Sequence, residues 1–372
     1  MHKKIILFFT LTVLLSALPL QAAESIKLGA IFAKSGAAAL ANEDHFAGFR
    51  LALKEINHAG GVLDRPLEGI EYDNRSEQIG ARMAAQKAVK DGVAAVVGNS
   101  WSSHSLAAGP VLQKAGIVML APDSTNSDVS KIGDYIFRSC FTDPLQGKVL
   151  ARFAVKELQL KKAAIMIDVK SDYSIGLASH FKENFNAMGG QVVIEEQYTH
   201  KQHNFAKQLE EIKLHNPDVL FIPGHDEAAF IARQAQKIGI DAIYLFGDGM
   251  DYASTVKKGV AKIKKGFFTN HWDSKVTSVQ SKHFVASLEK EGGIKLSSGA
   301  ALTYDSVYLL KNAIARAGST DPKAIRTALA QTGNYRGVTG IFNFNDQGDP
   351  IKSVVLMEIK DGELLFYKEL KP

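Results

Sequence analysis

Short apolar runs alternate with segments of helical spacing along most of the chain. The run at 26–32 has the composition of a buried strand, and the segment 46–56 places Phe46, Phe49 and Leu53 on one helical face. The same alternation predicts strands at 69–73, 94–98 and 117–121 and helices at 81–89 and 103–114. Strands and helices that alternate at these lengths are typical of parallel sheets with right-handed crossovers.

A second set of alternating elements begins after a break at 137–144. It predicts strands at 163–168, 191–198, 218–223 and 242–246 and helices at 176–188, 205–214 and 226–238. The tail differs, because it predicts long helices at 276–291 and 300–317 and a terminal hairpin around Asp361-Gly362. Two successive sets of β/α units predict an α/β protein with two doubly wound, Rossmann-like lobes.

Composition adds limits to this picture. The 372 residues are 46% hydrophobic and 22% charged, which is the balance of a globular protein, and the length exceeds what one core usually covers. A single cysteine excludes an internal disulfide. The net charge of +5 is spread over scattered lysines, so no nucleic-acid partner is expected.

The first 23 residues have the order of a secretory signal peptide. Lys3 and Lys4 precede an apolar run at 5–18, and the small residues Ala22-Ala23 follow. The run is shorter than the roughly 20 residues of a membrane span, and a retained anchor is the alternative. We expect that residues 1–23 are removed and that the mature protein is exported.

Catalytic and cofactor motifs are incomplete in this sequence. The stretch 98–102 lacks the second glycine of a nucleophile elbow, and Gly247-Asp248-Gly249 lacks the third glycine of a dinucleotide fingerprint. His225 and His271 have no acidic pair at metal-ligand spacing along the chain. We therefore expect a protein that is not an enzyme and that has neither a cofactor nor a metal site.

Four polar segments directly follow predicted strands. They are 99–103 and 122–126 in the first set of elements and 170–173 and 247–249 in the second. Ligands of open α/β sheets bind at the carboxyl ends of the strands, where helix N-termini also present free N–H groups. The division of these segments between two lobes predicts a small-molecule site in the cleft between them.

Each candidate side chain also has a purely structural interpretation, which the sequence leaves open. Ser102 can cap the helix that follows it, and Ser124 and Thr125 are common turn formers. Asp248 between two glycines suits a turn, and Tyr173 suits a half-buried surface position.

Several longer motifs follow one another along the chain. They are Glu55-Ile56-Asn57-His58-Ala59-Gly60-Gly61-Val62, Glu71-Tyr72-Asp73-Asn74, Ala121-Pro122-Asp123-Ser124-Thr125-Asn126, Asp172-Tyr173-Ser174-Ile175-Gly176, Gly247-Asp248-Gly249-Met250 and Phe344-Asn345-Asp346-Gln347-Gly348-Asp349. This ordered set covers essentially the whole chain after residue 23. It resembles the leucine/isoleucine/valine-binding family of periplasmic proteins.

The resemblance implies a periplasmic substrate-binding component of an ABC importer with a type I periplasmic binding fold. Three crossovers would join two lobes that close on an amino acid or a similar small carboxylate. Lobe one would comprise 24–139 plus 272–342, and lobe two 140–271 plus 343–372. The expected partners are this small-molecule ligand and an inner-membrane permease, and the protein is expected to be a monomer.

The resemblance also implies roles for individual residues. In relatives that bind amino acids, a serine of the first loop and a pair in the second loop hold the α-carboxylate and the α-amino group. The matching positions are Ser102, Ser124 and Thr125. A tyrosine and an acidic residue of lobe two close over the ligand, and these match Tyr173 and Asp248.

Two positions depart from the family pattern. Trp101 stands where members often have a smaller residue, so we expect it to narrow the pocket or to offer a stacking face. His225-Asp226 replaces a position that is commonly aromatic, which argues against an aliphatic ligand side chain. Asp226 and Asp123 are the alternatives to Asp248 for the acidic role.

Two other functions stay open from the sequence. A ligand-sensing module for a membrane receptor uses the same fold as an importer component. A hydrolase would act through Ser100 or Ser102.

Overall fold

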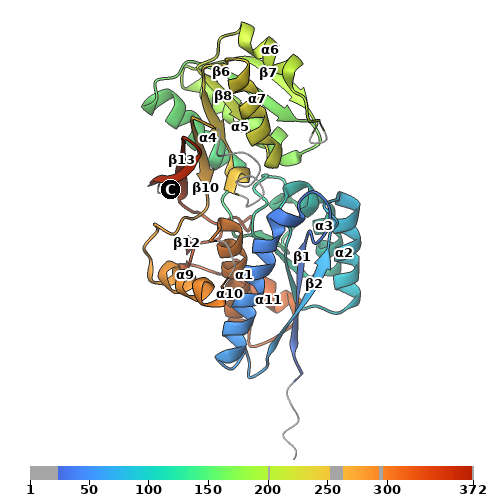
Figure 1. The fold of residues 1–372 in the computed structure, drawn as a ribbon. Helices are drawn as coiled ribbons and strands as arrows, with labels where there is room; N and C mark the ends of the chain where they lie inside the picture. The colour runs from blue at the N-terminus through green and yellow to red at the C-terminus, as the bar shows by residue number, and fades with distance from the viewer. Residues whose placement is uncertain (1–23, 200–201, 252–262, 293–295, 371–372) are drawn as a thin grey trace, which may run out of the picture.

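The computed structural model describes residues 24–199, 202–251, 263–292 and 296–370. These residues form two lobes, each built on a sheet that helices cover (Figure 1). The predicted signal peptide, 1–23, lies outside the described residues, so its removal stays a prediction. None of the helices in the described part of the chain combines the length and the apolar composition that a membrane crossing needs.

Lobe one is built on a parallel five-stranded sheet with the order β2-β1-β3-β4-β5. The strands are β1 (Ile26–Phe32), β2 (Leu67–Asp73), β3 (Ala95–Gly98), β4 (Val118–Ala121) and β5 (Ile136–Arg138). Early helices of this lobe are α1 (Ala39–His58), α2 (Gln78–Lys90), α3 (Ser102–Ala115) and the short η1 (Ser130–Ile132). Later segments add α9 (Val279–Glu291), α10 (Ser298–Ala317), α11 (Pro322–Ala330) and the strand pair β11 (Tyr335–Gly337) and β12 (Gly340–Phe342). Side chains of α1 and α10 belong to one apolar core with the sheet.

Lobe two is built on a seven-stranded sheet with the order β14-β13-β10-β9-β8-β6-β7. The strands are β6 (Lys162–Asp168), β7 (Gln191–Tyr198), β8 (Val219–Ile222), β9 (Ile243–Phe246), β10 (Lys265–Asn270), β13 (Val354–Lys360) and β14 (Glu363–Leu370). The helical segments are α4 (Asp143–Arg152), η2 (Phe153–Glu157), α5 (Asp172–Ala187), α6 (Ala206–Leu214), α7 (Asp226–Lys237) and η3 (Asp248–Asp251). Apolar clusters lie on both faces of this sheet.

The chain passes between the lobes three times. The passages lie between β5 and α4, between β10 and α9, and between β12 and β13. The α/β class, the two lobes and the three crossovers are therefore confirmed. The residue numbers given above for the lobe boundaries stay predictions.

The burial of the strands explains why the hydrophobic pattern located most of them. All four residues of β3, β4 and β8 are buried, because helices cover both faces of a parallel sheet. The hairpin of β13 and β14 is confirmed, since its strands pair antiparallel and its turn residues Asp361 and Gly362 both have positive φ.

The sequence pattern missed β5, α4, β10, α11 and the strand pair of β11 and β12. The expected break at 137–144 contains part of β5 and the start of α4. β5 has only three residues, which is too short for a recognisable period. β10 has two large apolar residues, Phe267 and Phe268, and α11 is a single short amphipathic helix.

Candidate ligand-binding site between the lobes

The structure gathers the seven predicted site residues where the two lobes meet, at the carboxyl ends of the strands. Lobe one supplies Trp101 and Ser102 after β3 and Ser124 and Thr125 after β4. Lobe two supplies Tyr173, His225 and Asp248, from the N-terminal ends of α5, α7 and η3. All are buried except Trp101, which is half-buried.

Ser102 is the first residue of α3 and not its cap. The N-cap position belongs to Trp101, and no side chain caps this helix, so the capping interpretation of Ser102 is wrong. Ser102 Oγ instead accepts a hydrogen bond from Asn126 N at 3.1 Å, which ties the two lobe-one loops together. The hydroxyl proton of Ser102 and the first-turn N–H groups of α3 can therefore serve an anion.

Ser124 supports the loop through its side chain. Its Oγ lies 2.7 Å from Ser105 Oγ and donates to the backbone oxygens of Asn99 and Ser100 at 3.0 and 3.1 Å. Its carbonyl accepts from Arg138 Nη1 at 2.7 Å. These partners all lie within lobe one, so the hydroxyl of Ser124 positions the loop.

Thr125 lies against a buried carboxyl group at the start of lobe two. Asp143 N donates to the Thr125 carbonyl at 2.8 Å, and the threonine hydroxyl interacts with the Asp143 side chain. Burial, together with the charge of Asp248, raises the pKa of Asp143 well above its usual range. Burial therefore disfavours the ionised form of the Asp143 carboxyl group beside Thr125.

Tyr173 and Asp248 approach each other from two elements of lobe two. Asp248 N donates to Gln146 Oε1 at 2.9 Å, and Gly249 N donates to Tyr173 Oη at 3.4 Å. A Cβ atom at Gly247 would lie 2.1 Å from Tyr173 Oη, so this close approach requires glycine. Burial, reinforced by the charge of Asp248, raises the pKa of Tyr173 well above its usual range, which keeps the phenol protonated.

A cluster of aromatic rings spans the cleft. The ring of Trp101 in lobe one lies 4.4 Å from the ring of His225 in lobe two, and Tyr173 lies 5.0 Å from His225 on the same lobe. His104 stacks on Trp101 at 5.3 Å, and burial lowers the pKa of His104 to about 4. The expected role of Trp101 toward a ligand, to narrow the pocket or to offer a stacking face, stays a prediction.

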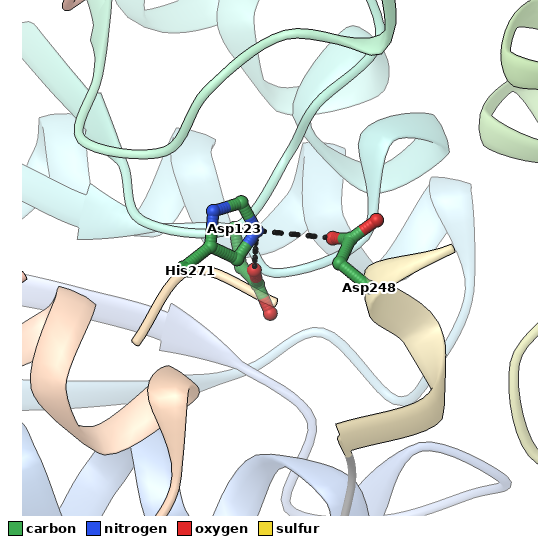
Figure 2. Close-up of side chains that lie close together, drawn as sticks. All are labelled: Asp123, Asp248 and His271. Atoms are coloured by element: carbon green, nitrogen blue, oxygen red, sulfur yellow. Dashed lines mark hydrogen bonds and ion pairs between the residues drawn. The ribbon is translucent and has the colours of Figure 1, made fainter. Parts of the chain in front are cut away.

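Three residues distant in sequence form the charged centre of the cleft. His271 Nε2 lies 3.2 Å from Asp123 Oδ1 and 3.1 Å from Asp248 Oδ2 (Figure 2). Burial alone would lower the pKa of His271, but the hydrogen bonds and charges of both carboxylates raise it. His271 has no acidic pair at metal-ligand spacing along the chain, but tertiary structure brings Asp123 and Asp248 to it.

His45 is a further residue that the sequence interpretation missed. It lies on α1, and its Nε2 is 3.5 Å from Asp123 Oδ2. Neither His45 nor His271 follows a predicted strand, since β10 was not predicted. The polar end of the short apolar run at Phe267-Phe268 was the one signal that could have pointed to His271.

The lobes are in direct contact beside these residues. Asn126 Nδ2 donates to the Asp172 carbonyl at 2.7 Å, and Asp172 N donates to Ser103 Oγ at 3.1 Å. On the other side, Asp251 Oδ2 accepts from the backbone N and the hydroxyl of Ser298 at 2.8 and 2.7 Å. The cleft is therefore in a closed arrangement.

A cavity elsewhere in the molecule lacks these features. About 960 Å³ in volume, it lies in lobe two beside α7 and includes Asp218, Phe230, Ile243 and Lys265 among its lining residues. Asp218, Ile243 and Lys265 lie at the amino ends of β8, β9 and β10, whereas ligands of open α/β sheets bind at the carboxyl ends. We therefore place the candidate site between the lobes.

The two serines considered as nucleophiles form hydrogen bonds with asparagine residues. Ser100 Oγ donates to Asn42 Oδ1 at 3.1 Å, and Ser102 Oγ accepts from Asn126 N. A nucleophilic serine is normally hydrogen-bonded to a general base. The geometry among the described residues instead suits binding, with neutral donors on lobe one and carboxylates at the centre of the cleft.

Two β/α lobes, three crossovers and a buried polar site between the lobes define a two-lobed solute-binding protein. A family model described as periplasmic binding protein matches residues 25–363. The Leu/Ile/Val-binding protein BraC3 of Rhizobium johnstonii is 30% identical over 343 residues, which are 91% of this chain and 92% of that protein. The chain belongs to the periplasmic binding protein family, in its group of Leu/Ile/Val-binding proteins.

Solved structures agree with this assignment. The leucine-binding protein LivK from Thermotoga maritima superposes with a TM-score of 0.89 at 33% identity, over 93% of this chain and 99% of that chain. The branched-chain amino acid transporter substrate-binding protein LivJ from Streptococcus pneumoniae, solved with isoleucine, gives 0.88 at 31% identity, over 94% and 100%.

Proposed function

We propose that this chain is an extracytoplasmic substrate-binding protein that captures an α-amino acid between its lobes and delivers it to the permease of an ABC importer. The observation that carries the proposal is the opposite polarity of the two lobes across the cleft. Lobe one presents hydroxyl and N–H donors at Ser102 and Thr125, and lobe two presents the carboxylate of Asp248. The carboxylate of a zwitterionic amino acid matches the donors of lobe one, and its ammonium group matches the carboxylate of lobe two.

The donors of lobe one bind the α-carboxylate in this proposal. The Ser102 hydroxyl and the first-turn N–H groups of α3 converge with Thr125, because Ser102 accepts from the neighbouring Asn126 N. Hydrogen bonds to a charged group are the stronger kind, and a helix N-terminus adds favourable electrostatics. Ser124 positions this loop, through its bonds to Asn99 and Ser100.

The carboxylate of Asp248 binds the α-ammonium group, and Tyr173 closes over it. Asp248 is buried, so a cation in contact with it is shielded from water and salt. Trp101 and His225 then cover the ligand side chain from the two lobes, since their rings are 4.4 Å apart. The protein acts by binding rather than by catalysis, and it functions as a monomer.

The named relatives support an amino-acid ligand. Those described above are leucine-binding or Leu/Ile/Val-binding proteins or bind isoleucine, and a Pseudomonas aeruginosa relative at 26% identity is named for leucine, isoleucine, valine, threonine and alanine. Their ligands share the α-amino and α-carboxylate groups and differ in the side chain. The shared groups are the ones that Ser102, Thr125 and Asp248 address here.

A thermal-shift screen of the protein from residue 24 onward against the twenty L-amino acids tests the binding. An amino acid present at 100 times its dissociation constant adds about 2.7 kcal/mol to the stability of the folded state. At least one should raise the melting temperature. A flat result with all twenty, for a cooperatively folded sample, would refute the amino-acid proposal.

Delivery to a permease and export need a cellular test. Cells that lack the gene should lose uptake of the amino acid found in the screen and regain it on complementation. The intact mass of the exported protein should lack residues 1–23. Uptake that is unchanged by the deletion would favour a sensory role instead.

A further inference from the structure

Asp123 places a second carboxylate beside the one that binds the α-ammonium group. Its Oδ1 lies 3.2 Å from His271 Nε2, and the same nitrogen lies 3.1 Å from Asp248 Oδ2 (Figure 2). One oxygen of each carboxylate and the His271 nitrogen all lie within 4.8 Å of one another. A ligand whose ammonium group contacts Asp248 therefore brings its neighbouring atoms within reach of Asp123.

Asp123 is an ionised acceptor at neutral pH. Burial opposes its ionisation, but the hydrogen bonds and charges of His271 and His45 outweigh burial and hold the pKa of Asp123 below its usual range. His45 Nε2 lies 3.5 Å from Oδ2, whereas His271 approaches Oδ1. A carboxylate has about four acceptor positions, so it can bind two histidines and a ligand donor together.

An aliphatic ligand side chain fits poorly against the ionised carboxylate of Asp123. Packing hydrocarbon on an ionised carboxylate removes its water without replacing the hydrogen bonds, which costs free energy. Two other buried polar atoms also lack hydrogen bonds within the described part of the chain. Trp101 Nε1 and His271 Nδ1 have no hydrogen-bond partner among the described residues. A ligand side chain with polar atoms can supply hydrogen-bond partners for these groups.

We propose that the amino acid bound here carries a polar side chain whose N–H or O–H group donates to Asp123, and that branched aliphatic amino acids are poor ligands. The inference rests on the proposed function and narrows it to one class of substrate. Asp123 is thus a specificity-determining residue, and His45 and His271 position its carboxylate.

Matched pairs of a polar and an aliphatic amino acid test the side-chain preference. The probes are L-threonine with L-valine, L-asparagine with L-leucine, and L-lysine with L-norleucine, each titrated calorimetrically into the protein. We compare the affinities within the pair whose polar member binds most tightly of the three. In that pair, the polar amino acid should bind at least about tenfold more tightly than its aliphatic partner.

Variants of Asp123 test which residue carries the preference. In Asp123→Ala the ratio within that pair should fall to about one, because the acceptor for the side chain is gone. Asp123→Leu keeps roughly the size of the side chain and also has no acceptor, so it serves if Asp123→Ala does not fold. The matched control is Asp128→Ala, since the Asp128 side chain is 64% exposed and its ion pair with Lys131 lies outside the cleft. It should leave both affinities unchanged.

The possible outcomes separate this inference from the proposed function. Aliphatic members that bind as tightly as polar ones overturn the inference and leave the amino-acid function intact. An equal loss for both members in both Asp123 variants also overturns it, because Asp123 would then contact the shared ammonium group. Two carboxylates and an imidazole also suit a divalent cation, so selectivity that disappears after EDTA treatment would overturn it as well. If no amino acid binds at all, both proposals fail.

Discussion

At the scale of single residues, the buried charged groups of the cleft contact one another across the lobes. Asp248 and Asp123 share the imidazole of His271, and each carboxylate comes from a different lobe. Buried charges that lose their partner are costly, because the remaining charge stays desolvated. Substitutions of these groups therefore test binding roles directly.

Asp248→Ala should weaken the binding of the amino acid found in the screen by roughly a hundredfold to a few thousandfold. The reason is that losing one partner of a buried ion pair costs about 3–5 kcal/mol. Calorimetric titration measures the effect, with Asp226→Ala as the matched comparison. Wild-type affinity in Asp248→Ala, or the larger loss in Asp226→Ala, would move the acidic role to another residue.

Arg138 is a buried residue that supports the site from behind. Its Nη1 donates to the carbonyls of Ser124 and Asn126 at 2.7 and 2.9 Å, and its Nη2 donates to Ser130 Oγ at 2.9 Å. Its Nε forms an ion pair with Asp349 at 2.6 Å. This one side chain connects the second loop of the site with the third crossover.

Arg138→Met should therefore lower the free energy of unfolding by about 3–5 kcal/mol, since it leaves a buried carboxylate unpaired. Urea denaturation measures the change. Arg138→Lys should restore little, because a lysine cannot reproduce the fork of donors. Arg152→Met, at an exposed position on α4, is the control, and a loss of equal size there would contradict the explanation.

At the scale of elements, the crossovers are bonded to one another. Lys352 lies between β12 and β13, and its Nζ donates to the carbonyl of Ser139 between β5 and α4 at 2.9 Å. The same nitrogen donates to Thr339 Oγ1 and lies 4.2 Å from the ring centre of Phe342. Two of the three connections between the lobes are thus joined by one buried lysine.

This lysine should make stability depend on pH. Burial lowers the pKa of Lys352 from 10.5 to about 8, with Asp305 opposing the shift. Between these values the unfolded chain binds more protons than the folded chain, so the free energy of unfolding rises with pH by roughly 2 kcal/mol between about pH 8 and pH 10. In Lys352→Met this part of the rise should vanish.

Urea midpoints of wild type and Lys352→Met at both pH values measure the difference. Other titrating groups contribute equally to both proteins and cancel in the comparison. A wild-type rise that persists unchanged in the variant would contradict the assignment to Lys352.

At the scale of the whole molecule, the site exists only where the lobes meet. Asn126 and Ser103 of lobe one bond to Asp172 of lobe two, and the rings of Trp101 and His225 contact each other across the cleft. A ligand that contacts both lobes favours the closed arrangement, because only a difference in contact between two states shifts their balance.

Small-angle X-ray scattering should accordingly show a smaller radius of gyration when the best amino acid from the screen is added at saturation. Asn126→Ala removes a hydrogen bond that exists only when the lobes meet, so this variant should need a higher ligand concentration for the same change. An identical radius with and without the amino acid, at confirmed saturation, would contradict ligand-driven closure.

The sequence by itself determined the two-lobed α/β class and most of the strands and helices. Parallel strands buried on both faces, such as Val219–Ile222, are continuous apolar runs, and helices repeat their apolar positions at a fixed spacing. It also located the loops at the carboxyl ends of the strands, including Ser102, Thr125 and Asp248. These signals are local, so a single stretch of chain contains them.

Only the tertiary structure decided how those loops combine. Asp123, Asp248 and His271 lie in three different segments, and no spacing along the chain relates them until the crossovers bring the lobes together. The hydrogen bond of Ser124 with Ser105 and the contact of Lys352 with another crossover also join residues that are distant in sequence. Sequence patterns report the environment of one segment, whereas the charge and shape of a cleft depend on contacts between segments far apart in the chain.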